Sequence, residues 1–231
     1  YFINFANQII YNFRFLSALM GMTSKIFWKL SLIRFASLTF PVPTEIMILF
    51  KLSDAKSFLL YFGISMITSL LILFAMQQNI SWSIDFRDKR RIQFFNQLCY
   101  CIILVISSFI YVNYCTKLDI LLTIFITTEV YYGISFQVYS AIAQGMIETK
   151  MAGKYNGFSE IFGQVPTLFG SLITASIWSI LSISEIILLT AVIGFIILPS
   201  IISLPSAKTT IEHHNSIKNE TNIIKFLRHN W

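Results

Sequence analysis

Charged and amide side chains inside otherwise apolar stretches are the residues of this sequence best able to do chemistry. A charge at the centre of a membrane helix costs about 2.5–3.5 kcal/mol on insertion scales, so such groups are functional candidates by default. A carboxyl group in that setting can exchange protons, and amide and basic side chains can bind a polar solute. The candidates for such a pathway are Arg34, Glu45, Glu129, Gln137, Gln144, Glu160 and Gln164.

The spacing of these candidates places them on three helical stripes, over residues 34–45, 129–144 and 160–171. Residues three or four positions apart share one face of a helix. Because lipid offers no hydrogen-bond partner, each stripe must face protein or water, which predicts a polar cavity between three helices. The alternative is that these side chains only join helices, each hydrogen bond contributing about 0.6 kcal/mol. For Glu45 and Glu129 we favour the cavity, whereas Glu160 can also reach the lipid headgroups.

The elements that must position these groups are membrane helices. Of the 231 residues, 55% are hydrophobic and only 12% are charged, about half the charge of a typical soluble domain. Crossing the hydrocarbon core takes about 20 predominantly apolar residues. Six blocks reach that length, so we expect an all-α, multi-pass transmembrane helix bundle with spans near 28–49, 55–76, 94–115, 119–144, 157–180 and 183–204.

The distribution of basic residues predicts the orientation of these spans. With the amino terminus inside, only Lys51, Lys56 and Lys117 of the 17 Lys and Arg residues lie on the outer side, which leaves 14 inside. Loops on the cytoplasmic side carry this excess in most membrane proteins. We therefore expect both termini in the cytoplasm and the bundle in the inner or plasma membrane. The net charge of +6 is a signal of topology and of lipid contact, and no nucleic-acid partner is expected.

Three regions follow from this pattern. Residues 1–27 are expected to form an N-terminal extension at the membrane surface, and a seventh span there is the alternative. Residues 28–205 form the six-helix transmembrane domain. Residues 206–231 are polar and charged, and we expect a cytoplasmic linker that runs into a short interfacial helix or a disordered tail.

Small residues and proline in the fifth block predict close helix packing. Small residues on one face let a second helix approach, and proline bends the helix that contains it. The residues concerned are Gly163, Pro166 and Gly170. A bend beside a cavity could also act as a gate, although packing is the simpler interpretation.

Cofactor and enzyme chemistry have little support in the sequence. The three histidines lie in the polar tail, and no cysteine spacing matches a zinc site. The chain has no Ser–His pair and no pair of carboxylates at a fixed catalytic spacing. We therefore expect neither a cofactor, nor a metal, nor an enzymatic activity.

The links between the blocks are expected to be short, except for a charged turn at 81–92 between the second and third blocks, and this turn carries the most specific motif. Residues 81–91 read Ser-Trp-Ser-Ile-Asp-Phe-Arg-Asp-Lys-Arg-Arg. This segment resembles the cytoplasmic signature of the major facilitator superfamily: a Gly, three residues, an Asp, a basic residue, then a Gly and a basic pair. Asp85, Arg90 and Arg91 fall at the matching places. The departures from the pattern are at Ser81, Phe86 and Asp88.

The resemblance extends over residues 25–231 and implies the amino-terminal half of such a transporter, in a drug-exporter-like branch. It implies six spans arranged as two three-helix repeats, with a substrate path between two six-helix halves that rock in alternating access. Asp85 would cap a helix and pair with the basic residues across an inner gate. The Arg-containing signature of the fourth helix is absent, and Gln137 and Gln144 stand in that region.

On this basis we expect a transporter half that exports a small molecule in exchange for protons. Its partners would be membrane lipid, the small-molecule substrate and a second six-helix half, either a missing carboxyl-terminal half or a second copy. One alternative is a multi-pass membrane protein that does not transport, such as an immunity, assembly or partner-binding factor. The other is a truncated transporter fragment.

Overall fold

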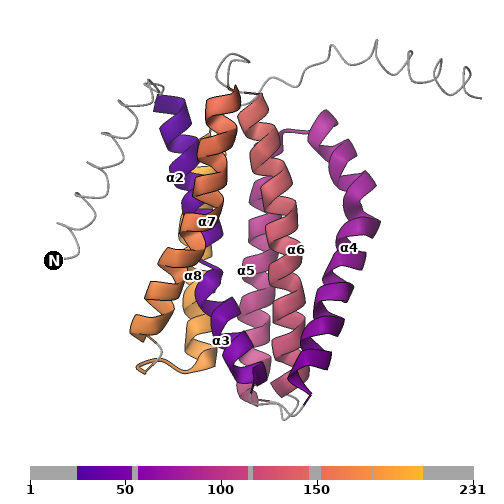
Figure 1. Ribbon diagram of the computed structural model, residues 1–231, viewed down its shortest axis with the longest axis vertical. Coiled ribbons are helices and arrows are strands. Elements are labelled where there is room, and N and C mark those ends of the chain that lie inside the picture. The colour runs from indigo at the N-terminus through magenta and orange to yellow at the C-terminus, as the bar shows by residue number, and fades with distance from the viewer. Residues whose placement is uncertain (1–24, 54–56, 114–116, 146–151, 178, 205–231) are drawn as a thin grey trace, which may run out of the picture.

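The computed structural model describes residues 25–53, 57–113, 117–145, 152–177 and 179–204, and these form helices joined by short links, with no strand. The helices run side by side in a bundle (Figure 1). The predicted all-helical bundle is confirmed at this level. Of the extension predicted at 1–27, residues 1–24 lie outside the described residues, and 25–27 belong to the first described helix. The tail predicted at 206–231, with its interfacial helix, also lies outside the described residues. The helices are α2 (Lys25–Thr39), α3 (Val42–Ser53), α4 (Phe58–Phe86), α5 (Lys89–Asn113), α6 (Lys117–Gln144), α7 (Ala152–Ile177) and α8 (Ile183–Ile202).

Five stretches of the described chain are long and apolar enough to cross a membrane: Trp28–Ser53, Phe58–Phe86, Lys89–Asn113, Leu118–Gln144 and Ile183–Ile202. Large apolar side chains cover their outer surfaces, among them Leu59 and Phe74 on α4, which are more than 80% exposed. Such a surface is stable in lipid and would aggregate in water. The block predicted at 157–180 lies largely in α7, where Gln164–Ile177 forms a shorter apolar segment.

The first predicted span, 28–49, consists of two helices rather than one. Helix α2 ends at Thr39 and α3 begins at Val42, with Phe40 and Pro41 in a turn between them. Pro41 and Pro43 have no N–H group, so neither can donate to the carbonyl four residues earlier. Backbone bonds from Phe40 to Ala36 (3.2 Å) and from Glu45 to Pro41 (3.1 Å) continue the hydrogen bonding on either side of the break.

The charged turn expected over residues 81–92 is mostly helical. Helix α4 continues to Phe86 and α5 begins at Lys89, so Arg87 and Asp88 alone separate them. Hydropathy marks the end of the hydrocarbon and not the end of the helix, because a helix still satisfies its own backbone groups in the headgroup region. The expectation of a loop was wrong for this reason.

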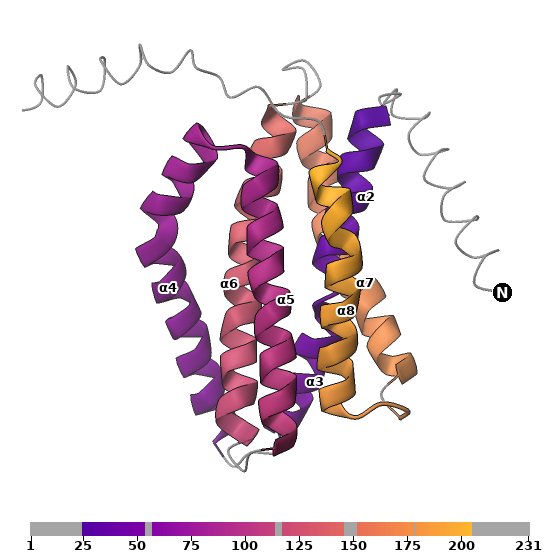
Figure 2. The same ribbon diagram turned by 180° about the vertical axis from the view of Figure 1, so that it is seen from behind.

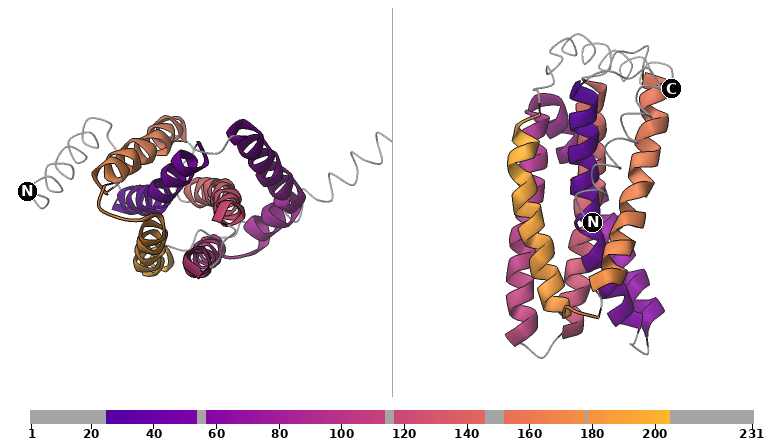
Figure 3. Two further views of the ribbon diagram at one scale, coloured as in Figure 1. Left: turned by 90° about the horizontal axis from the view of Figure 1, so that it is seen from below. Right: turned by 90° about the vertical axis from the view of Figure 1, so that its left-hand side faces the viewer.

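Helix α5 packs along both α6 and α8, α4 packs on α6, and α2 and α3 pack on α7. Figure 3 shows the resulting arrangement from below, with α4 and α7 at the periphery. The interior holds two apolar clusters. One contains Leu30, Val138 and Ile201, and the other contains Ile48, Leu104 and Phe125. The polar side chains described below lie on the same helices.

Glycines mark the places where helices come closest. A Cβ atom added to Gly170 of α7 would overlap the Val42 side chain at the start of α3, and one added to Gly133 of α6 would lie 2.7 Å from Leu73 of α4. Pro166 is buried in α7, and the helix continues through it. Gly163 is in α7, but its surroundings lie outside the described residues. A methyl group at position 170 would therefore push α3 and α7 apart.

We predict that Gly170→Ala lowers the thermal stability of the purified protein in detergent, because the new methyl group must displace the Val42 side chain. Overpacking of this kind costs about 1–3 kcal/mol. Gly63→Ala on α4 is the matched control, since nothing lies within 4 Å of a Cβ atom there. Equal melting temperatures for the two variants would contradict the close approach of α3 and α7.

Candidate functional site

Two of the predicted stripes meet beside the break between α2 and α3. Glu45 lies in the first turn of α3, and Glu129 lies midway along α6. The two carboxyl groups are close enough to interact electrostatically, and the Tyr132 hydroxyl lies near the Glu45 carboxyl group. That hydroxyl also lies 3.3 Å from the Leu38 carbonyl at the end of α2. Glu45, Glu129 and Tyr132 are all half-buried.

This carboxyl pair lies well inside the membrane-crossing stretches. Counted at about 1.5 Å per residue, Glu45 is roughly 12 Å from the end of its stretch at Ser53, and Glu129 is roughly 17 Å from Leu118. Two carboxylates this close repel each other, and hydrocarbon disfavours each charge. A carboxyl pair in this setting is a candidate for binding and releasing a proton.

Tyr131 of α6 compensates for the hydrogen bond that is lost at the proline break. Without an N–H on Pro41, the Ser37 carbonyl has no donor in the backbone ladder. The Tyr131 hydroxyl of α6 lies 3.0 Å from that carbonyl and donates to it, and it also lies 3.2 Å from the side-chain oxygen of Gln97 on α5. Tyr131 is buried and stacks on Tyr100, with ring centroids 4.5 Å apart. Three helices thus meet at the break.

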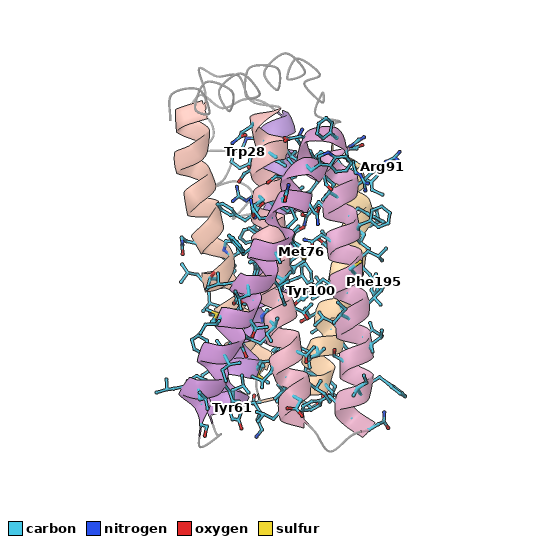
Figure 4. All side chains as sticks on the ribbon, turned by 90° about the vertical axis from the view of Figure 1, so that its right-hand side faces the viewer. Trp28, Tyr61, Met76, Arg91, Tyr100 and Phe195 are labelled. Atoms are coloured by element: carbon cyan, nitrogen blue, oxygen red, sulfur yellow. The ribbon has the colours of Figure 1, made fainter. Side chains whose placement is uncertain are left out.

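A polar face of α5, which the sequence did not single out, completes this network. Gln93 donates to the Ser135 hydroxyl (2.9 Å) and Gln97 donates to the Gly194 carbonyl of α8 (2.7 Å), and both amides are fully buried. Figure 4 shows Tyr100 inside the bundle, where its hydroxyl lies 3.0 Å from that of Thr128. The spacing of this face, at i, i+3, i+4 and i+7, is visible in the sequence, but unlike the three predicted stripes it contains no charged residue. Its members are Gln93, Asn96, Gln97 and Tyr100.

Arg34 lies on the inner face of α2, one turn before Ser37. Its side chain is buried, and its guanidinium carbon lies 5.4 Å from the centre of the Phe136 ring on α6. The Ser37 hydroxyl next to it accepts a hydrogen bond from Tyr139 (2.8 Å). The predicted stripe on α2 therefore faces α6, as a cation above an aromatic ring and a hydroxyl pair.

The remaining pathway candidates do not gather at the carboxyl pair. Gln137, two turns from Glu129 along α6, donates to the side-chain oxygen of Gln77 on α4 (3.0 Å). Gln144 at the end of α6 and Gln164 on α7 are exposed. Glu160 is in α7, but its side chain lies outside the described residues.

The turn between α4 and α5 holds a second polar cluster, centred on Arg90. The Arg90 guanidinium forms an ion pair with Asp88 (2.6 Å) and donates to the Leu204 carbonyl just after α8 (2.7 Å). Lys29 of α2 donates to the Ser203 carbonyl in the same place. These two cations satisfy carbonyls that the end of α8 leaves open and oppose its helix dipole.

The acidic partner in this cluster is Asp88 rather than Asp85. Asp88 accepts the backbone N–H and the side-chain N–H groups of Arg90, and this hydrogen bonding lowers the pKa of Asp88. Asp85 and Arg91 are exposed, and among the described residues neither forms an ion pair. In the motif of residues 81–91, Asp88 is one of the positions that depart from the family pattern. Its position directly before a helix start was the signal that could have identified it.

Comparison with known families, with characterised proteins and with solved structures gave no match. The chemistry of the two clusters is therefore the basis for a functional assignment.

We predict that Tyr131→Phe lowers thermal stability by about 1–3 kcal/mol, the usual cost of leaving a buried acceptor without its donor. The loss should shrink in a Pro41→Ala background, because an alanine there has a backbone N–H that can bond to the Ser37 carbonyl. Melting temperatures of the two single variants and the double variant in detergent measure this coupling. Additive effects would mean that Tyr131 does not compensate for Pro41, and Tyr61→Phe serves as a control for losing a hydroxyl elsewhere.

We predict a pH-dependent contribution from Asp88. Its pKa is lowered in the folded chain from the ordinary value of 3.8, so the Arg90 contact stabilises fully above that value and is lost as the pH falls through the lowered pKa. Near neutral pH, Asp88→Asn should therefore lower the free energy of unfolding by about 1 kcal/mol or less relative to the wild type. The gap should close as the pH is lowered below 3.8. A stability difference between Asp88→Asn and the wild type that does not change with pH would exclude the ion pair. The control is Asp85→Asn, which should be as stable as the wild type.

Proposed function

We propose that this chain is one half of a secondary transporter that moves a small molecule in exchange for protons. The observation that supports the proposal is the pair of carboxyl groups, Glu45 and Glu129, at a helix break within the membrane. Discontinuous membrane helices place unpaired backbone groups and helix ends at the midplane, where transporters bind substrates and coupling ions. Here the break supplies the Leu38 carbonyl and the first turn of α3, and α6 supplies Glu129 and Tyr132.

The proposal includes six spans arranged as two three-helix repeats, with α7 as the remaining span. Its 26 residues measure about 39 Å as a helix, enough for a hydrocarbon core of about 30 Å. One repeat would consist of α2 with α3, α4 and α5, and the other of α6, α7 and α8.

The proposed orientation places both termini in the cytoplasm. Helix α2 begins, α4 and α5 join, and α8 ends at one end of the bundle, which we call the basic end (Figure 1). Lys29 and the segment 87–91, with four of its five residues basic, lie there. Lys51 in the last turn of α3 and Lys117 at the start of α6 lie at the opposite end. This asymmetry supports a cytoplasmic basic end and a location in the inner or plasma membrane.

A second six-helix half would face α4 and α6. Gln77 of α4 is exposed and Gln137 of α6 is half-buried, and they bond to each other within stretches that cross the membrane. Polar side chains on the outside of such helices need water or protein opposite them. A water-lined path between this bundle and a second half, as the resemblance of residues 81–91 to the major facilitator superfamily implies, meets that need.

The proposal is tested with the chain paired with a second half, either a second copy or the carboxyl-terminal half, in liposomes that contain a pH-sensitive dye. We predict that one or more compounds of a small-molecule panel drive proton movement. Glu45→Gln and Glu129→Gln should each reduce it to background, because an amide cannot take up a proton. Asp119→Asn is the matched control, since that carboxyl group lies exposed in the first turn of the same helix as Glu129.

Retention of compound-driven proton movement in both glutamine variants would remove the carboxyl pair from the mechanism. The absence of any such movement in liposomes that contain folded, correctly oriented protein would favour the alternative, a bundle that binds a partner and does not transport.

A further inference from the structure

The outer side of the turn between α4 and α5 carries a groove that the proposed transport path does not use. It has a volume of about 590 Å³ and is lined by Ser83, Arg87, Asp88, Arg91, Ile92 and Phe95. Helices α4 and α5 separate below this turn (Figure 2), so the groove opens between two stretches that cross the membrane. It therefore lies where the headgroup region meets the hydrocarbon.

The charge in this groove is positive. Asp88 is the acidic residue of the lining, and its carboxylate is held by Arg90, with both of its oxygens within 3.2 Å of that guanidinium. Arg87 and Arg91 are exposed on the groove side, and Figure 4 shows Arg91 projecting away from the bundle. The pairing of Asp88 with Arg90 thus leaves two guanidinium groups to attract an anion.

Aromatic side chains frame these two cations. The Arg87 guanidinium carbon lies 5.5 Å from the centre of the Trp82 ring, which keeps the cation next to the α4 surface. Trp82, Phe86 and Phe95 are each more than half exposed, and the Trp82 and Phe86 rings are 5.4 Å apart. Aromatic rings beside arginines are characteristic of the membrane interface.

Below the cations the walls become apolar. Ile92 and Phe95 line the groove on α5, and Phe95 is more than half exposed. A ligand that fits has an anionic group next to hydrocarbon chains. Free phosphate would use the cations and leave these walls uncovered.

We propose that this groove binds an anionic glycerophospholipid of the bilayer. The phosphate and the acidic headgroup lie between Arg87 and Arg91, with Ser83 as a hydroxyl donor, and the acyl chains lie along α4 and α5. This assignment does not depend on transport, because it rests on the charge, aromatic frame and apolar walls of the groove.

The test uses the full chain purified in a mild detergent. Native mass spectrometry and thermal unfolding are measured with dioleoyl phosphatidylglycerol, with dioleoyl phosphatidylcholine, and with glycerol 3-phosphate. We expect phosphatidylglycerol to remain bound and to raise the melting temperature more than the other two. Arg87→Gln and Arg91→Gln should each weaken its binding about fivefold, as expected for one basic contact at the membrane surface.

Lys89→Gln is the matched control, since Lys89 lies in the same turn and carries the same charge but does not line the groove. Equal loss in Lys89→Gln and the arginine variants would overturn the site in favour of general surface charge. If glycerol 3-phosphate stabilises the chain as much as phosphatidylglycerol, the ligand is not a lipid. If phosphatidylcholine does so, the site does not require an anionic headgroup. A further measurement, which needs no arginine variant, is the quenching of tryptophan fluorescence by brominated phosphatidylglycerol. We expect this quenching to decrease when Trp82 is replaced by Phe, and unchanged quenching would contradict the site.

Discussion

The structure depends on one constraint: a backbone carbonyl inside a membrane needs a donor from within the protein. Pro41 and Pro43 remove two donors from the first membrane-crossing stretch, those for the Ser37 and Thr39 carbonyls, and hydrocarbon offers no donor in their place. The donor for the Ser37 carbonyl comes from Tyr131 of α6, and the Leu38 carbonyl has the Tyr132 hydroxyl at 3.3 Å. The position of α6 against α2 is thereby tied to a local defect in α2. Without these two tyrosines the break would carry unpaired acceptors in hydrocarbon.

The same constraint explains why the interior combines polar and apolar residues. Tyr131 also contacts the Gln97 side chain, and Gln97 donates to the Gly194 carbonyl of α8, so one chain of hydrogen bonds links α2, α6, α5 and α8. Gly194 is a close-packing position, where a Cβ atom would overlap Cys101 and approach Phe40 to 2.8 Å. In lipid, apolar contact alone does not favour one neighbour over another, because lipid tails are equally apolar. Hydrogen bonds and close packing at small residues supply that specificity here.

The sequence predicted the membrane bundle because hydropathy and length act locally: a block of about 20 apolar residues needs no partner to be recognised. It also placed Glu45 and Glu129 on facing stripes, since helical periodicity is a local property as well. It did not predict the break at Pro41, because proline within a membrane helix is compatible with a bend or with two helices. The amide face of α5 was missed because each predicted stripe contains a charged residue, and the face with Gln93 and Gln97 contains none. Asp88 was missed because the motif directed attention to Asp85, although Asp88 directly precedes a helix start and pairs with Arg90.

On the proposed function, the Leu38 carbonyl and the nearby Glu45 carboxylate would compete for the single proton of the Tyr132 hydroxyl, which would link the charge of Glu45 to the helix break. When Glu45 is ionised, it is the stronger acceptor, and donation to it leaves the Leu38 carbonyl with less. When Glu45 is protonated, it no longer attracts the hydroxyl as a charge, and Tyr132 can turn to the carbonyl. Protonation therefore changes which groups hold α2 and α3 together at their junction. On the proposed function, this exchange supplies a physical route from proton binding at the carboxyl pair to movement of the broken helix.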